Sequence, residues 1–203
     1  AASDVYKRQL DKIYTADYYY VKFFDSDNGV IVCGYAKSND TNESSRIYST
    51  SNGGESWDIV GSGPATNIIK GVVYVSSDVG FFCYDYVEGM DSNLYKTDDG
   101  GKTFAKVMLE EQELDSSAAN PQGQETETKT DSGKNGADSS EQLRWGDVYK
   151  EALTPVVDST GIITIYLTQG KNAVYNDGKT AAKYQSSDKG STWKYIGQVE
   201  IKD

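Results

Sequence analysis

The fold is decided by a stretch that reads Thr50-Ser51-Asn52-Gly53-Gly54-Glu55-Ser56-Trp57. It recurs as Thr97-Asp98-Asp99-Gly100-Gly101-Lys102-Thr103-Phe104 and again as Ser186-Ser187-Asp188-Lys189-Gly190-Ser191-Thr192-Trp193. All three copies fit Ser/Thr-x-Asp/Asn-x-Gly-x-Ser/Thr followed by an aromatic residue, and each has a Tyr just upstream in an alternating, strand-like run. We call these copies box 1, box 2 and box 3.

The pattern has the chemistry of a hairpin turn. An Asp or Asn side chain accepts backbone N–H bonds from the residues that follow it, and a Gly two positions later supplies a positive φ. The Ser/Thr hydroxyl adds a local bond, and the aromatic residue enters the core where the next strand begins. The pattern is carried by Thr50, Asn52, Gly54, Ser56 and Trp57; by Thr97, Asp99, Gly101, Thr103 and Phe104; and by Ser186, Asp188, Gly190, Thr192 and Trp193.

The pattern resembles the Asp box, or bacterial neuraminidase repeat, of sialidase-like and sortilin-like β-propellers. In that superfamily the box is the turn between the third and fourth strands of a blade. Box 1 departs from it only in having Asn52 where Asp is usual. The resemblance implies an all-β chain of three four-stranded antiparallel blades. Since three blades do not close a ring, we expect an open arc, the C-terminal part of a longer bacterial propeller.

Box spacing sets the expected domain boundaries. Asn52 and Asp99 are 47 residues apart, close to the roughly 40–50 of known blade repeats. Asp99 and Asp188 are 89 apart, which leaves room for one blade and an insertion. We expect blade 1 at 10–62, blade 2 at 63–109, an insertion at 110–144 and blade 3 at 145–203. Four strands are expected in blade 3, at 152–157, 162–168, 181–186 and 192–199.

Two segments are expected to lie outside the blades. The stretch 110–142 carries a net charge of −7 out of −11 for the chain, and Leu114 is its one large apolar residue. It should be disordered, either as a solvated insertion or as an acidic segment that attracts a cationic partner. Residues 1–9 resemble adaptor read-through at the broken end of a metagenomic reading frame, the alternative being an ordinary frayed terminus.

Composition excludes several classes of function. The net charge of −11 argues against nucleic-acid binding, and no apolar run reaches the roughly 20 residues that span a bilayer. The absence of His removes His-based triads and most zinc sites, and no cofactor or metal is expected. The stretch 25–29 resembles the start of a calcium loop, but Ala36 stands where an EF-hand needs Glu, so a polar turn is preferred. Cys33 and Cys83 lie in strands of different blades and are expected to be buried free thiols.

No complete catalytic set is visible in the sequence. Sialidases hold their substrate carboxylate with three arginines, whereas this chain has only Arg8, Arg46 and Arg144. A carboxylate pair for glycoside hydrolysis stays open, because sequence does not show distances in space.

The resemblance implies where a ligand would bind. In Asp-box propellers the boxes lie on one face and ligands meet the opposite face, which here would receive the loops 39–45, 87–92 and 170–179 and the exit of the insertion. The candidate ligand-binding residues are Arg46, Tyr86, Glu88, Asp91, Trp145, Tyr175 and Asp177. We expect a non-catalytic binding or scaffolding module for a glycan or a protein, at the cell envelope or outside the cell. The alternatives are part of a sialidase-like or xyloglucanase-like glycoside hydrolase, and an assembly factor that docks on a protein.

Overall fold

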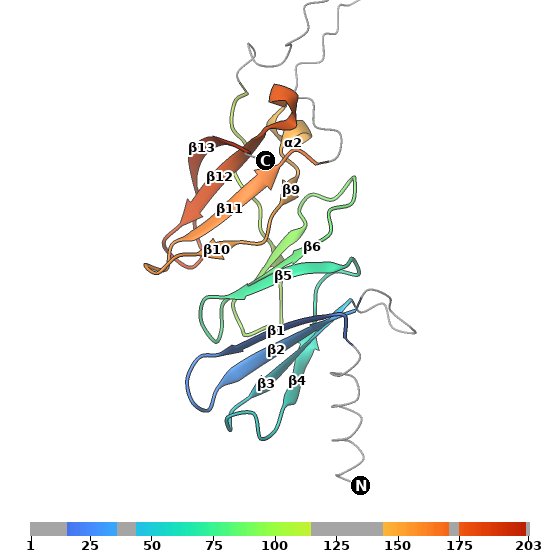
Figure 1. The fold of residues 1–203 in the computed structure, drawn as a ribbon, viewed down its shortest axis with the longest axis vertical. Helices are drawn as coiled ribbons and strands as arrows, with labels where there is room; N and C mark the ends of the chain where they lie inside the picture. The colour runs from blue at the N-terminus through green and yellow to red at the C-terminus, as the bar shows by residue number, and fades with distance from the viewer. Residues whose placement is uncertain (1–15, 36–43, 115–143, 171–174, 202–203) are drawn as a thin grey trace, which may run out of the picture.

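The described residues are nearly all β and form three antiparallel sheets that follow one another along the sequence (Figure 1). The computed structural model describes residues 16–35, 44–114, 144–170 and 175–201. The expectations for residues 1–9 and for most of the insertion, 115–143, lie outside the described residues. Among the described residues, no helix has the length and apolar character needed to cross a membrane.

Each of the first two sheets is a four-stranded meander. The first contains β1 (Tyr18–Phe23), β2 (Gly29–Gly34), β3 (Ser45–Thr50) and β4 (Asp58–Ser62), in the order β1-β2-β3-β4. The second repeats this order with β5 (Ile69–Tyr74), β6 (Gly80–Tyr84), β7 (Leu94–Thr97) and β8 (Ala105–Lys106). Such sheets have the architecture of propeller blades, and the three together form a β-propeller-like open array.

The third sheet has the same plan with a broken first strand. It contains β9 (Glu151–Ala152), β10 (Val156–Val157), β11 (Ile163–Thr168), β12 (Thr180–Ser186) and β13 (Lys194–Glu200). Both β9 and β10 pair with the same edge of β11, so they occupy the place of one strand. The sequence prediction of one strand at 152–157 was wrong in this respect. Pro155 lies in the gap, where its missing N–H cannot donate to the ladder.

The sheets are stacked face to face, and burial follows from their place in the stack. All five residues of β6, in the middle sheet, are buried, because this strand is covered on both faces. In β1 and β13, which belong to the outer sheets, half-buried and exposed residues alternate. This period of two is typical of a strand with one covered face and one free face.

Two apolar clusters join the sheets. Between the first and second sheets, Val32 and Ile47 pack with Val72 and Phe82, with further members in both sheets. Between the second and third, the cluster consists mainly of Phe81, Cys83, Leu94, Val107, Ala152, Ile163 and Ile165. Contacts of this kind supply most of the stability of stacked sheets, at roughly 25 cal/mol per Å² of apolar surface buried.

Polar contacts cross both interfaces beside these clusters. The hydroxyls of Tyr18 and Tyr20 accept bonds from the backbone N–H groups of Val72 and Tyr74 on β5. The Asn93 side chain donates to the backbone oxygen of Ala152 and accepts from its N–H, both at 2.9 Å. These bonds fix how neighbouring sheets are set against each other.

The boxes form the expected turns between the third and fourth strands. In box 2, Asp99 Oδ1 accepts bonds from Thr97 Oγ1 (2.8 Å) and from the backbone N–H of Thr103 (2.8 Å). Asp99 Oδ2 accepts from Thr103 Oγ1 (2.6 Å), and Asp188 makes the same bonds in box 3. In box 1 the last bond is reversed, because Asn52 Nδ2 donates to Ser56 Oγ (2.8 Å).

The turns differ from the sequence expectation in their backbone. The pattern predicts one residue of positive φ per box, but each box has two in succession. They are Gly53 and Gly54, Gly100 and Gly101, and Lys189 and Gly190. Lys189, with φ of +57°, is a side-chain-bearing residue in a conformation that favours glycine.

The box aromatics pack as the pattern predicts, within or between sheets. Phe104 lies 4.9 Å from Phe82 in an edge-to-face contact inside the second sheet. Trp193 makes a similar contact, at 6.0 Å, with Phe81 of the preceding sheet. Trp57 meets Phe23 of its own sheet at 6.0 Å.

Cys33 and Cys83 are both buried and free, as the sequence predicts. Burial raises the pKa of each thiol to about 11. Cross-strand pairing shows that they do not occupy equivalent positions, since Cys33 is opposite Arg46 while Cys83 is opposite Leu94.

The chain stays packed against the sheets beyond residue 109, where the sequence analysis placed the end of blade 2. Tyr184 Oη donates to the backbone oxygen of Glu110 (2.6 Å), and Leu114 packs against a cluster that includes Trp145, Tyr149 and Tyr184. Residues 110–114, assigned to the insertion from their charge, therefore run along the third sheet.

Candidate functional site

The clearest cleft lies between the second and third sheets, at the end of the stack away from the boxes. It has a volume of about 280 Å³. Its walls come from the β6–β7 loop, the segment after β8, the short helix α2 (Trp145–Val148) and the residues leading into β9. The strand pairing places all three box turns at the opposite ends of the sheets, as the resemblance implies.

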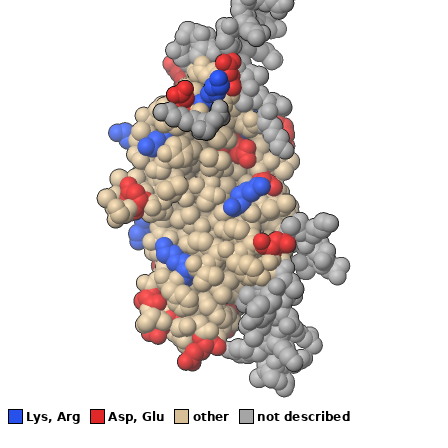
Figure 2. Space-filling view, viewed as in Figure 1, with Lys and Arg blue, Asp and Glu red and all other residues tan. Residues whose placement is uncertain are grey.

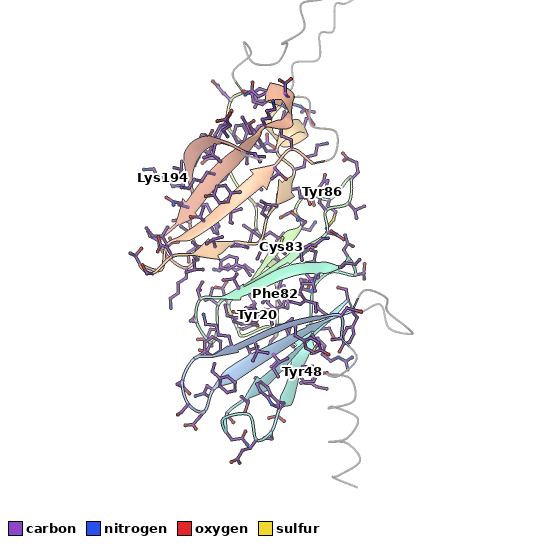
Figure 3. All side chains as sticks on the ribbon, in the orientation of Figure 1. Tyr20, Tyr48, Phe82, Cys83, Tyr86 and Lys194 are labelled. Carbon is purple, nitrogen blue, oxygen red and sulfur yellow. The ribbon has the colours of Figure 1, made fainter. Side chains whose placement is uncertain are left out.

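The loop side of the cleft is built by a polar turn. After β6 the chain runs through Tyr86 and Asp91 before it re-enters the sheet at Asn93. Gly89 takes φ of +92° and allows the sharp reversal of this loop. Figure 3 shows Tyr86 at the end of the second sheet, beside the first strand of the third.

The far side of the cleft is built by α2 and the chain that follows it. Trp145 and Val148 are buried, and the Trp145 ring lies 4.6 Å from that of Tyr149 and 5.3 Å from that of Tyr195. Trp145 is thus an anchor that holds the wall in place. Lys150 extends from this wall to Glu88 on the loop, with Nζ 2.8 Å from Oε1.

Ion pairs favour the charged forms of Asp91 and Lys150. The hydrogen bond from Lys106 Nζ, at 2.7 Å, lowers the pKa of the Asp91 carboxyl. The hydrogen bond to Glu88 raises the pKa of the Lys150 ammonium. For Tyr86, partial burial and then the nearby Glu88 raise the pKa of the phenol. The site thus offers a phenol that donates, carboxylates that accept and an ammonium that donates.

The structure brings together four of the seven candidate residues. Tyr86, Asp91 and Trp145 line the cleft, and Glu88 adjoins it through Lys150. The other three lie apart: Arg46 is on β3 of the first sheet, while Asp177 is exposed in the turn η2 (Tyr175–Gly178). Tyr175 is buried, with its ring 6.2 Å from that of Tyr149. The sequence analysis assigned all seven residues to one face because of the loops they lie in or near. The sequence does not show which two sheets enclose a cleft.

Several lining residues were not predicted. Glu111 was placed in the disordered insertion because of its charged neighbours, although Leu109 and Leu114 on either side were a sign of packing. Asn93 and Lys150 directly precede β7 and β9, and only the three-dimensional structure shows that both line one cleft.

A second cavity of about 230 Å³ lies between the first and second sheets at the box end. It is lined by residues that include Phe24, Asn28, Asp58, Asp99 and Lys102. The Asp99 carboxylate is already engaged in the turn of box 2, with bonds from Thr97, Lys102 and Thr103. Asp99 therefore serves the local structure of the turn, and we place the candidate site at the other cleft.

Comparison with known proteins assigns the chain to no family. No family model matches the chain, and no curated protein matches it. Among solved structures it is similar to the GH74 enzyme of Niastella koreensis, with a TM-score of 0.38 and 16% sequence identity. The match covers 82% of this chain and 19% of that enzyme, so the chain spans about a fifth of its length.

Proposed function

We propose that this chain is part of an Asp-box β-propeller protein, exported by a bacterium, that binds a glycan in the cleft between the second and third sheets. One observation carries the proposal: the cleft combines a half-exposed aromatic ring, Tyr86, with the carboxylate of Asp91 and the ammonium of Lys150. Carbohydrates are bound by rings that pack against the sugar and by polar groups that orient its hydroxyls. The box hydrogen bonds support the Asp-box assignment.

Binding without turnover is the better supported role. A retaining or inverting glycosidase needs one carboxylic acid that stays protonated to serve as general acid. Lys106 lowers the pKa of Asp91, which favours its ionised form, and the Glu88 carboxylate is held by Lys150. These carboxylates are suited to accepting hydrogen bonds from sugar hydroxyls.

Hydrolysis is the second candidate, because Glu111 lines the same cleft as Asp91. A reducing-end assay on every glycan that binds separates the two roles. Turnover that is lost in Glu111→Gln while binding is kept would establish the hydrolase.

The test of binding is a glycan array probed with the 203-residue chain, followed by calorimetric titration of the best ligand. Tyr86→Ala removes the ring and should weaken binding by about tenfold or more, equivalent to roughly 1.4 kcal/mol. The matched control is Tyr166→Ala, since Tyr166 is a half-exposed tyrosine on β11 that does not line the cleft. Equal losses for both variants, or no glycan bound at all, would reject the site.

A further inference from the structure

The charged groups that line the cleft between the second and third sheets do not balance. Its charged lining residues are Asp91, Glu111 and Lys150. The Asp91 carboxylate is paired with Lys106 at 2.7 Å, and the Lys150 ammonium is paired with Glu88 at 2.8 Å. Within the described part of the chain, Glu111 forms no ion pair. One carboxylate of the cleft is therefore left for a ligand.

The backbone that carries Glu111 is anchored on both sides. The Tyr184 hydroxyl donates to the backbone oxygen of the preceding residue, Glu110, at 2.6 Å. Leu109 and Leu114 both pack against the aromatic cluster of the third sheet. The cleft thus receives the Glu111 side chain from a segment whose position is fixed by packing.

The Glu111 carboxylate itself lies against the wall formed by α2. A Cβ added at Gly146 would lie 2.6 Å from Glu111 Oε1 and 3.4 Å from Glu111 Cδ. Side-chain atoms do not approach a Cβ as closely as 2.6 Å, so the glycine leaves the space that the carboxylate occupies. Both residues line the cleft, and the position of the unpaired negative charge is therefore defined.

This charge decides which ligands the cleft favours. An anionic sugar would bring a like charge toward Glu111, and like charges brought together oppose binding. Lys150 is the one lysine of the lining, and it is already engaged by Glu88. The remaining lining includes the half-exposed Tyr86 ring and the apolar side chain of Met108, which is 63% exposed. A ligand that combines a positive charge with a sugar ring complements these groups.

We propose that the ligand of the cleft is an amino sugar with free amines, such as an oligomer of glucosamine, and that Glu111 binds one of its ammonium groups. An ammonium donating to a carboxylate forms a charge-assisted hydrogen bond, which is stronger than a bond between neutral groups. Tyr86 packs against the sugar, and Asp91 accepts from its hydroxyls. The inference rests on the proposed glycan site and adds the chemical class of its ligand.

The test compares two ligands that differ in whether their nitrogen is charged. They are the β-1,4-linked tetramers of glucosamine and of N-acetylglucosamine, each titrated calorimetrically into the 203-residue chain at about pH 6, where a free amine is protonated. The chain should bind the glucosamine tetramer about fivefold more tightly at low salt, as one exposed ion pair allows. This preference should shrink at about 1 M salt, which screens charges beyond about 3 Å.

Two variants locate the effect at Glu111. Glu111→Gln removes the charge and keeps the shape, whereas Gly146→Ala keeps the charge and displaces the carboxylate. Each should reduce the preference for the free amine to about twofold or less. Glu110→Gln is the matched control, because Glu110 is the exposed neighbouring acid and does not line the cleft, and it should keep the original preference. A preference that survives either cleft substitution would overturn the assignment.

Failure of this inference and failure of the glycan site give different results. Equal affinities for the two tetramers, or binding of neither while the array selects another glycan, would overturn the amino-sugar class alone. A chain that binds no glycan would reject the site as well. Tetralysine has as many ammonium side chains but no sugar ring, and it should bind more weakly than the glucosamine tetramer. Equal binding of tetralysine would instead assign the cleft to a cationic peptide.

Discussion

At the scale of single residues, the box carboxylates are the most strongly perturbed acids of the described structure. Hydrogen bonds from the Thr103 side chain and backbone hold the pKa of Asp99 well below its usual range, and Thr192 does the same for Asp188. Asp188 is exposed and Asp99 is half-buried, and burial raises the pKa of a carboxyl, so the lowering comes from donors arranged by the turn. The carboxylate and the turn therefore stabilise each other.

This arrangement makes stability depend on pH. A carboxyl whose pKa is depressed by folding contributes stability that is present above its unfolded pKa of about 3.9 and is lost as the pH falls. We expect the free energy of unfolding to decrease below about pH 4, and Asp188→Asn to reduce that decrease. Urea unfolding at pH 6.5 and pH 3.0 measures both effects. Asn52→Asp is the reverse control and should steepen the dependence; an unchanged difference in both variants would contradict the turn as described.

The two left-handed residues of box 3 are expected to respond oppositely to substitution. Gly190→Ala places a methyl group against Phe81 at φ of +77° and should cost about 2–3 kcal/mol of unfolding free energy. Lys189→Gly relieves an unfavourable φ of +57° against the entropy of the added glycine, for a gain of at most about 1 kcal/mol. Chemical denaturation followed by circular dichroism measures both. A loss of stability in Lys189→Gly would show that the Lys189 backbone is unstrained.

At the scale of elements, the Asn93 side chain holds β9 to the second sheet by two buried bonds. Its removal leaves the N–H and the oxygen of Ala152 without these partners, which should cost about 2–4 kcal/mol. Asn67→Ala is the control, because Asn67, just before β5, donates to Asp85 and Met90 in the β6–β7 loop of the same sheet. It should cost about 1 kcal/mol or less. Thermal unfolding of Asn93→Ala and Asn67→Ala compares them, and equal costs would deny that the bond between sheets matters.

The strands were largely readable from the sequence because each box fixes the register around it. Alternation upstream of Thr50, Thr97 and Ser186 located the third strands, and the second strands followed. The break between β9 and β10 lies at Pro155, and the prediction of one continuous strand at 152–157 did not take this proline into account. The packing of residues 110–114 was missed because their charge outweighed the signal of Leu109 and Leu114, which both pack on the third sheet in the structure.

At the scale of the whole molecule, the candidate cleft lies between the second and third sheets, on the side away from the boxes. Figure 2 shows charged side chains set singly or in small groups on the face in view, with wide uncharged areas between them. The sequence predicted the side on which a ligand would meet the sheets. It could not predict that Arg46 and Asp177 lie outside the cleft while Asn93 and Lys150 line it, because that depends on how two sheets face each other.

The central claim is that the cleft between the second and third sheets is the binding site, and chemical-shift mapping tests it most directly. The ¹⁵N-labelled 203-residue chain is titrated with the glycan that the array selects. We predict that the largest shifts occur at the amides of Tyr86, Asp91, Asn93, Glu111 and Lys150, and that they saturate together. Shifts centred on the boxes or on the first sheet would contradict the claim.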